Sequence, residues 1–418
     1  MNCPYLSANL SDGNLKRSRG GSRTAPTPGE NAHGEMRMSN LICTRCNQRF
    51  PLEEKIWKCA CGGLLDIDFQ PHFPMDKIRQ RKPTMWRYRE AIPLFEDKNM
   101  ISFDEGFTPL IPINFGAKTV WVKQDHLFPT GSYKDRGASV LVSKMRELGI
   151  PSVVEDSSGN AGCAIAAYCA RAGIQCQIFV PEDTAAGKLA QIRLYGARLN
   201  RIPGSREDTA HAVLNAAEND YYASHSWNPF FFQGTKTFAF EVWEQLGWKA
   251  PDALIVPVGN GTLLLGAFIG FQELFNAGMV SQVPKIIGVQ SANCAPLYKA
   301  FRENLTEIPK IDRQDTLAEG IAIAEPIRGK QILEAVKKSK GAFISVDELE
   351  IKESIRRLCA MGFYIEPTSA ATIAGLSKYL ESSHLDEIIV SVFTGHGLKT
   401  TEKMVKLLRE LSLTPESS

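Results

Sequence analysis

Hydrophobic and polar positions follow one another along the chain in a pattern typical of strands that alternate with helices. After residue 118, short runs rich in β-branched residues predict buried strands, and each leads into a helical run of small or apolar residues. The clearest strands are predicted at 119–123, 152–154, 255–258 and 388–393. Because such alternation is typical of parallel sheets covered by helices, the predicted fold class is α/β.

A glycine and serine turn follows the first of these strands and carries Lys134. The run Thr130-Gly131-Ser132-Tyr133-Lys134-Asp135-Arg136-Gly137 leads into a predicted helix. An amine at a helix start is held in place, which a lysine requires if it is to form a Schiff base with pyridoxal phosphate (PLP). A solvated lysine in the first helical turn is the common alternative, so this segment needs support from other motifs.

Three further strand-to-helix turns are rich in small and polar residues. Ser157-Ser158-Gly159-Asn160 offers more hydroxyl, amide and backbone N–H groups than an ordinary helix cap uses. Gly259-Asn260-Gly261-Thr262 precedes an apolar helix, and glycine at a helix N-terminus favours a bound phosphate, although this signal is weak by itself. Thr394-Gly395-His396-Gly397 ends a strand, where a hydroxyl faces the crevice in which open α/β sheets bind ligands.

These four segments, in this order, resemble the fold-type II PLP-dependent enzymes of the tryptophan synthase β family, and among them the threonine synthases. The resemblance spans about residues 41–405 and is supported by the runs Glu105-Gly106-Phe107-Thr108-Pro109, Gly234-Thr235-Lys236-Thr237, Ala318-Glu319-Gly320 and Glu366-Pro367-Thr368-Ser369. It implies two three-layer α/β/α domains with PLP between them. The expected small domain covers about 131–234, and the expected large PLP-binding domain combines about 68–130 with 235–418.

The resemblance also implies a role for each matching residue. Lys134 is the expected Schiff-base lysine and proton carrier, Asn160 contacts the 3′ oxygen of PLP, and Thr394 meets its pyridine nitrogen. A hydroxyl, unlike a carboxylate, does not keep that nitrogen protonated. His396 is expected to line the ring pocket rather than to transfer a proton. The expected cofactor-phosphate residues are Gly259, Asn260, Gly261, Thr262 and Leu263, and the expected substrate-binding residues are Thr108, Ser157, Ser158 and Lys236.

The implied reaction converts O-phosphohomoserine and water to threonine and phosphate. One departure bears on the substrate, because Phe230-Phe231-Phe232 stands where threonine synthases tend to carry a polar or basic residue before a glutamate. β-Replacement or β-elimination on a serine-, phosphoserine- or threonine-type substrate, as in cysteate synthase or a dehydratase, therefore stays open. A non-catalytic regulatory homologue is a third interpretation, which an intact Lys134 and an intact phosphate turn disfavour.

Four of the ten cysteines are grouped near the N-terminus. The spacing Cys43-x-x-Cys46, then twelve residues, then Cys59-x-Cys61 resembles a zinc ribbon at about 41–67, in which four thiolates surround one tetrahedral ion. The single residue inside the second pair strains that geometry. A ribbon held only by packing, through Phe50, Ile56, Trp57 and Leu64, is the alternative. The other cysteines are scattered and predict reduced core residues of a cytoplasmic protein, and no catalytic metal is expected.

Composition narrows the possible partners. A net charge of +2 over 418 residues does not favour nucleic acid or a membrane surface, and no apolar run is long enough to span a membrane. The expected partner is a small amino-acid substrate, and the resemblance alone implies a homodimer. Residues 1–40 are rich in serine, glycine, arginine and proline, which predicts a disordered tail or a true start at Met36 or Met38.

Overall fold

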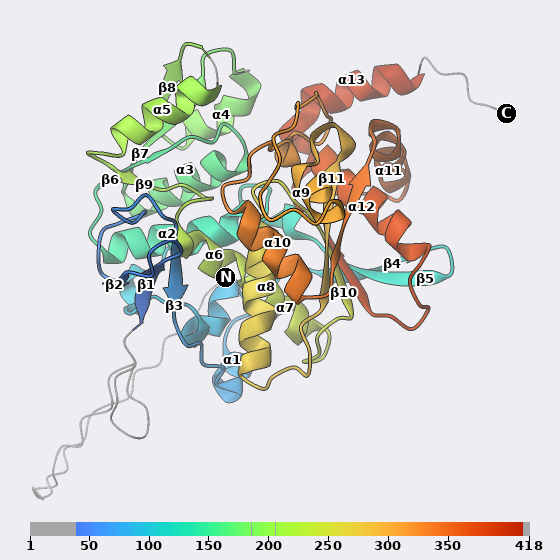
Figure 1. The fold of residues 1–418 in the computed structure, drawn as a ribbon, viewed down its shortest axis with the longest axis horizontal. Helices are drawn as coiled ribbons and strands as arrows, with labels where there is room; N and C mark the ends of the chain where they lie inside the picture. Colours follow the sequence, from blue (N-terminus) through green and yellow to red (C-terminus); the bar gives the residue numbers. More distant parts are fainter. Residues whose placement is uncertain (1–38, 185, 205, 413–418) are drawn as a thin grey trace, which may run out of the picture. The chain divides into compact units, whose positions relative to one another are not determined.

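The computed structural model describes residues 39–184, 186–204 and 206–412, and all but the end of the predicted disordered segment at 1–40 lies outside them. The largest sheet is made of β4 (Leu110–Phe115), β5 (Lys118–Lys123), β10 (Ala253–Pro257), β11 (Lys285–Ser291), β12 (Ala342–Val346) and β13 (Ile389–Val392). Its order is β12-β11-β10-β13-β5-β4, and all neighbours are parallel except β4 and β5. Figure 1 shows this sheet among its covering helices.

Both faces of the large sheet are buried, which the alternation along β10 makes clear. Leu254 and Val256 belong to one apolar core, and Ala253 and Ile255 belong to another. Side chains that alternate along a strand point to opposite faces, so helices cover the sheet on both sides. The first core is completed by α7 (Thr237–Gln245), α8 (Thr262–Asn276), α9 (Pro296–Arg302) and α10 (Gly329–Lys338), and the second by α11 (Glu348–Ala360), α12 (Pro367–Leu380) and α13 (Thr401–Ser412).

A second, all-parallel sheet has the order β8-β7-β6-β9. Its strands are β6 (Ser152–Glu155), β7 (Gln175–Pro181), β8 (Arg198–Ile202) and β9 (Tyr221–Tyr222). The helices interleaved with them are α2 (Lys134–Glu147), α3 (Asn160–Ala172), α4 (Ala186–Leu194) and α5 (Arg206–Ala216). Small residues in α3 allow a close approach, since a Cβ on Gly162 would lie 1.8 Å from the carbonyl oxygen of Ser157.

A third sheet is small and antiparallel. It has the order β2-β1-β3 and consists of β1 (Asn40–Cys43), β2 (Arg49–Pro51) and β3 (Leu65–Asp68). Trp57, from the loop of this ribbon, packs edge-on against Tyr222 and Trp227 with ring centroids 4.9 and 5.6 Å apart. The ribbon therefore packs on β9 and on the segment that follows it. The predicted α/β fold with a ribbon-like N-terminal module is confirmed.

Helix α6 (Pro229–Thr235) carries the phenylalanine run and packs tightly on α2. A Cβ on Gly137 would lie 2.3 Å from the ring of Phe231, and a Cβ on Gly234 would lie 1.9 Å from the carbonyl oxygen of Arg136. Phe230, Phe231 and Phe232 are buried, with exposed fractions of 1%, 0% and 3%. The run is core packing between two helices, so it does not line the substrate pocket that its sequence position suggested.

The remaining elements are short connections. They are α1 (Met75–Gln80) and the 3₁₀ segments η1 (Met85–Ala91), η2 (Asp97–Asn99), η3 (Asp125–Leu127), η4 (Ala292–Cys294), η5 (Glu319–Ile321) and η6 (Gly397–Thr400). The described residues fall in one compact unit, so the predicted boundaries between a small and a large domain stay predictions. Within the described ranges, no helix combines the length and the apolar character needed to cross a membrane.

Candidate active site

The sequence motifs converge because their strands are neighbours. Strands β10, β13 and β5 lie side by side and parallel, and their carboxyl ends lead to the turns that carry Gly259, Thr394 and Lys134. Strand β6 of the second sheet leads to the turn that ends at Asn160. All four turns line one cavity with a volume of about 970 Å³. Ligands of open α/β sheets bind at such an edge.

Lys134 is the first residue of α2, and its side chain reaches the start of α8. Its Nζ donates a hydrogen bond to Oγ1 of Thr262 at 2.8 Å, and the hydroxyl of Tyr133 lies 2.8 Å from the same oxygen. The backbone N–H of Tyr133 donates to the carbonyl oxygen of Thr394 at 3.0 Å. Lys134 is thus held between the phosphate turn and the end of β13.

The turn before α8 has the shape of a phosphate cradle. Gly261 has a φ of +70°, and a Cβ there would lie 2.3 Å from the side chain of Ile332. Gly259 is also restricted, since its Cβ would lie 3.0 Å from Cα of Ile321. Glycine therefore brings bare backbone N–H groups to the N-terminus of a 15-residue helix, where the dipole favours an anion. Gly259, Asn260, Gly261 and Thr262 line the cavity and fit the phosphate of PLP.

Thr394 also lines the cavity and is only 3% exposed. Its Oγ1 is 3.1 Å from Oγ of Ser369, which also accepts a hydrogen bond from the backbone N–H of Thr394 at 2.9 Å. Ser369 thus fixes the threonine hydroxyl at the cavity wall. This geometry suits a neutral hydrogen-bond partner for a pyridine nitrogen.

Asn160 also lines the cavity, where its Nδ2 donates to Oε2 of Glu366 at 2.9 Å. Burial raises the pKa of Glu366 to about 7, although Lys399 and Asn160 act against that rise. His126 is a second titratable side chain at the cavity. Burial, together with the nearby His396, lowers the pKa of His126 to about 4. His126 is therefore neutral at physiological pH, and Glu366 is partly protonated.

Not every predicted site residue reaches the cavity. Ser157, Ser158 and His396 line it, whereas Leu263, Thr108 and Lys236 do not. Leu263 is 1% exposed and points into the apolar core. Nζ of Lys236 is buried and donates to Oε1 of Glu273 at 2.8 Å and to Oε1 of Gln233 at 2.5 Å, so it does not point into the cavity. The expected role of Lys236 in binding the substrate stays a prediction, and its ammonium pairs within the protein here.

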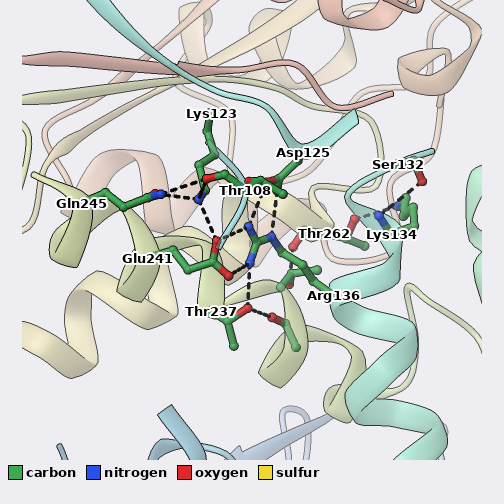
Figure 2. A network of polar contacts seen from close by, with 12 residues as sticks. Thr108, Lys123, Asp125, Ser132, Lys134, Arg136, Thr237, Glu241, Gln245 and Thr262 are labelled. Carbon is green, nitrogen blue, oxygen red and sulfur yellow. Dashed lines mark hydrogen bonds and ion pairs between the residues drawn. The ribbon is translucent and has the colours of Figure 1, made fainter. Parts of the chain in front are cut away.

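Thr108 belongs to a buried ionic network instead (Figure 2). Its Oγ1 donates to Asp125 Oδ1 at 2.7 Å, and its carbonyl oxygen accepts from Lys123 Nζ at 2.6 Å and from Gln245 at 2.9 Å. The hydroxyl and the carbonyl oxygen of Thr108 are thereby committed within the protein. The expected contact of Thr108 with the substrate likewise stays a prediction, and its hydroxyl pairs with Asp125 here.

Arg136 is the centre of that network and lies two residues after Lys134. Its guanidinium donates to both carboxylate oxygens of Asp125 at 2.8 Å, and to those of Glu241 at 2.6 and 2.8 Å. A further bond of 3.1 Å to Thr237 engages its fifth N–H, and Lys123 Nζ lies 2.7 Å from Glu241. These four charged side chains are fully buried and sum to zero charge. Burial alone would raise the pKa of Glu241, but Arg136 and Lys123 lower it to about 2.

Several cavity-lining residues carry no role in the sequence prediction. They are the acid Glu366, the histidine His225, and the cations Arg313 and Lys399. Lys399 is held in place, since its Nζ donates to Thr130 O and Gln191 Oε1, both at 2.8 Å. Glu366 and Lys399 belong to sequence motifs that had already been singled out, so those motifs could have indicated that both residues reach the cavity. His225 and Arg313 are separated from those motifs in sequence and are brought in only by the fold.

The four N-terminal cysteines form a separate cluster. The Sγ atoms of Cys43, Cys46, Cys59 and Cys61 lie within 4.8 Å of one another, with contacts of 3.5–3.6 Å between them. Four thiolates bound tetrahedrally to zinc have sulfurs about 3.8 Å apart. The backbone N–H groups of Arg45 and Cys46 point to Cys43 Sγ at 3.4 and 3.5 Å. The shortened second pair therefore does not prevent the thiolates from converging.

Comparison with known proteins identifies the family. Residues 101–395 match the family model of pyridoxal-phosphate dependent enzymes, and the chain belongs to this family. It is 37% identical to a threonine synthase of Methanocaldococcus jannaschii over 88% of this chain and 95% of the relative. A threonine synthase of Methanosarcina acetivorans is 33% identical over 89% of this chain and 95% of the relative. The enzyme class is accordingly a PLP-dependent lyase of the threonine synthase type.

Solved structures share the fold. A serine racemase from Dictyostelium discoideum superimposes with a TM-score of 0.61 at 27% identity, covering 70% of this chain and 92% of that one. A threonine deaminase from Solanum lycopersicum superimposes with a TM-score of 0.65 at 22% identity, covering 83% and 92%. The predicted PLP fold of type II and the PLP cofactor are thereby confirmed.

Replacing Arg136 with Met is expected to lower the free energy of unfolding by about 3–5 kcal/mol, because Asp125 and Glu241 are left buried without their partner. Urea unfolding followed by circular dichroism measures this. As a control, Lys338→Met removes an exposed pair with Glu334 and should change stability by about 0.5 kcal/mol or less. Adding Glu241→Gln to Arg136→Met should recover part of the loss. Equal effects of Arg136→Met and Lys338→Met would contradict the assignment.

Glu366→Gln is expected to remove a pH dependence of stability. Since burial raises the pKa of Glu366 from 4.5 to about 7, the folded state binds more protons than the unfolded state between these values. Stability therefore falls as pH rises through that window, by on the order of 2–3 kcal/mol. The measurement is urea unfolding of protein freed of PLP. The free energy of unfolding of Glu366→Gln should equal that of wild type near pH 5 and exceed it at pH 8. Parallel curves at both pH values would show that Glu366 is ionised throughout.

Proposed function

We propose that this enzyme converts O-phosphohomoserine and water to threonine and phosphate. The observation that carries the proposal is the meeting of Lys134, the glycine turn before α8, Asn160 and Thr394 in one cavity. The threonine synthases at 33–37% identity over most of the chain support the same substrate. The proposed cofactor-binding set is Lys134, Asn160, Gly259, Asn260, Gly261, Thr262 and Thr394, with Ser157 and Ser158 as substrate contacts.

The charge of the cavity favours an anionic substrate. Lys134, Arg313 and Lys399 line it, against the carboxyl groups of Glu319 and Glu366. The pKa of Glu366 is raised to about 7, so this group adds less than a full negative charge near neutral pH. A substrate that carries both a carboxylate and a phosphate is attracted to such a site more than a neutral-side-chain amino acid is.

Each residue then has a defined task. PLP, once bound, supplies an electron sink for the α carbon of the amino acid. Lys134 Nζ, held at the start of α8, accepts the proton from that carbon and returns protons later in the cycle. The Thr394 hydroxyl would serve as a neutral partner of the pyridine nitrogen, which would limit the strength of the sink. The hydroxyls and N–H groups of the turn at Ser157 and Ser158 orient the substrate carboxylate.

The alternative is β-replacement or β-elimination on a serine-, phosphoserine- or threonine-type substrate. Solved racemase and deaminase structures share the fold, so the fold itself is compatible with that chemistry. The two proposals differ in the leaving group and its position. Threonine synthesis requires recognition of a phosphate on the γ carbon, whereas elimination from threonine requires no phosphate site.

Phosphate release from O-phosphohomoserine, with the amino-acid product identified, tests the proposal. We expect threonine and phosphate in equal amounts, and little turnover of O-phosphoserine or threonine. Lys134→Ala should lower kcat on the order of 10³-fold or more and abolish the visible absorbance of lysine-bound PLP. Lys330 is an exposed lysine outside the cavity, and Lys330→Ala is the matched control. It should leave both kcat and the visible absorbance unchanged. Turnover of another substrate in place of phosphohomoserine would establish the alternative.

We further propose that Cys43, Cys46, Cys59 and Cys61 hold a structural zinc ion. The support is the contact distance of 3.5–3.6 Å between their Sγ atoms. The ribbon adjoins the main body through a buried guanidinium, since Arg328 donates to Leu65 O at 2.9 Å and to Ser226 O at 2.9 Å. Zinc would thus stabilise a module on which a cavity loop rests. We also propose, from the resemblance and the expected reduced cysteines, that the protein is a cytoplasmic homodimer.

Elemental analysis of the purified protein is expected to find about one zinc ion per chain. Cys46→Ser and Cys61→Ser should each lose the metal and lower the melting temperature, because a structural zinc contributes directly to folding. Cys359 is an exposed cysteine outside the cluster, so the Cys359→Ser variant should keep the metal and the wild-type melting temperature. A metal-free wild-type protein whose melting temperature equals that of Cys46→Ser would favour the ribbon held by packing alone.

A further inference from the structure

The tyrosine beside the proposed Schiff-base lysine carries a hydroxyl that the proposed mechanism does not use. Tyr133 lines the cavity, and its hydroxyl oxygen lies 2.8 Å from Oγ1 of Thr262. Nζ of Lys134 donates to the same oxygen of Thr262, also at 2.8 Å. The amine is therefore linked to the tyrosine hydroxyl through a single threonine hydroxyl, as Figure 2 shows for the contact between Lys134 and Thr262.

The backbone on both sides of this contact is held by the rest of the fold. Thr262 is the first residue of α8 and is buried. Its carbonyl oxygen accepts a hydrogen bond from Oγ1 of Thr235 at 2.9 Å, which ties the start of α8 to α6. The backbone N–H of Tyr133 donates to the carbonyl oxygen of Thr394 at 3.0 Å. The two hydroxyls are thus carried by elements that are anchored separately.

The number of hydroxyl hydrogens shows what the tyrosine adds. A threonine hydroxyl has one hydrogen to donate and two lone pairs that accept. Nζ of Lys134 uses one lone pair of Thr262 Oγ1, so the contact with Tyr133 uses either the other lone pair or the hydrogen. In both arrangements, rotation of Thr262 about its Cα–Cβ bond would break the contact with Tyr133. The tyrosine therefore keeps the threonine oxygen aimed at the lysine amine.

The amine has few other places to bind. Among the described residues, Oγ1 of Thr262 is the single hydrogen-bond acceptor of Lys134 Nζ. The remaining neighbours are aromatic, with the ring centroid of Tyr133 at 4.9 Å from Nζ and that of Phe231 at 5.7 Å. Phe231 is fully buried between α2 and α6. The direction of the amine therefore depends on one hydroxyl, and the direction of that hydroxyl depends on Tyr133.

We propose that Tyr133 is a positioning residue, which acts through Thr262 to hold the Lys134 amine whenever that amine is not bonded to the cofactor. The proposal rests on the proposed function, because it assumes that Lys134 bonds to the cofactor and moves protons. Lysine has a long and flexible side chain, so an amine without a fixed partner samples many positions. An amine held at one place in the cavity reacts more often.

The test compares wild type with Tyr133→Phe, which keeps the ring and removes only the hydroxyl. The full chain, freed of PLP, is mixed with pyridoxal, an aldehyde that has no phosphate, and the visible absorbance is followed over time. Bonding of the Lys134 nitrogen to the aldehyde carbon releases one water molecule, and Lys134→Ala gives the background. We expect the rate constant of Tyr133→Phe to be lower by about fivefold, the effect of one lost hydrogen bond. In the PLP-loaded enzyme, kcat should fall similarly, whereas KM should change by less than about twofold.

Thr262→Val gives a second variant, which removes the hydroxyl between the tyrosine and the amine. It should slow the reaction with pyridoxal at least as much as Tyr133→Phe does. The double variant should be no slower than Thr262→Val, because the tyrosine acts only through the threonine and the two effects are not additive. Tyr379→Phe is the matched control, since it removes a hydroxyl that donates to Oε1 of Glu387 at 2.7 Å outside the cavity. It should react at the wild-type rate.

The outcomes separate the positioning role from the proposed function. If wild type makes threonine but Tyr133→Phe reacts with pyridoxal as fast as wild type or faster, the role is overturned and the function stands. If O-phosphohomoserine is not a substrate but Tyr133→Phe is slow only when the Thr262 hydroxyl is present, the role stands without that function. Slowing with PLP but not with pyridoxal would assign the tyrosine hydroxyl to the cofactor phosphate, and equal slowing with and without the Thr262 hydroxyl would assign it to the fold. Either of these two results overturns the role.

Discussion

The buried pairing of Arg136 with Asp125 and Glu241 is the constraint on which the active site depends. It joins the helix that begins at Lys134 to the segment after β5 and to α7, with every N–H of the guanidinium engaged. A charge network of this kind tolerates only one arrangement, because any shift leaves a buried charge without a partner. The position of the lysine therefore follows from contacts made two residues further along the same helix.

Close packing imposes a second constraint on the same helix. Gly137 and Gly234 let α2 and α6 approach so closely that Phe231 fills the space where a side chain would stand. The phenylalanine run is thus explained by packing and not by substrate chemistry. The ring of Phe231 also lies near two cavity residues, with its centroid 6.0 Å from the ring of His225 and 5.7 Å from Nζ of Lys134.

Burial also tunes the charges around the cavity. It raises the pKa of Glu155 and Glu366 and lowers that of His126, so burial shifts all three groups toward their neutral forms. Lys134, Arg313 and Lys399 line the cavity, which suits it to anions.

The sequence by itself determined the α/β class, the four turns and the cysteine cluster, because strand and helix periodicity and glycine-rich turns are local signals. It also placed Lys134, Asn160, Gly259 and Thr394 among the candidates that line the cavity. Only the tertiary structure decided that Lys236 and Thr108 face buried partners, and that His225 and Glu366 reach the cavity. Direction and burial of a side chain depend on elements distant in the chain, and no local pattern records them.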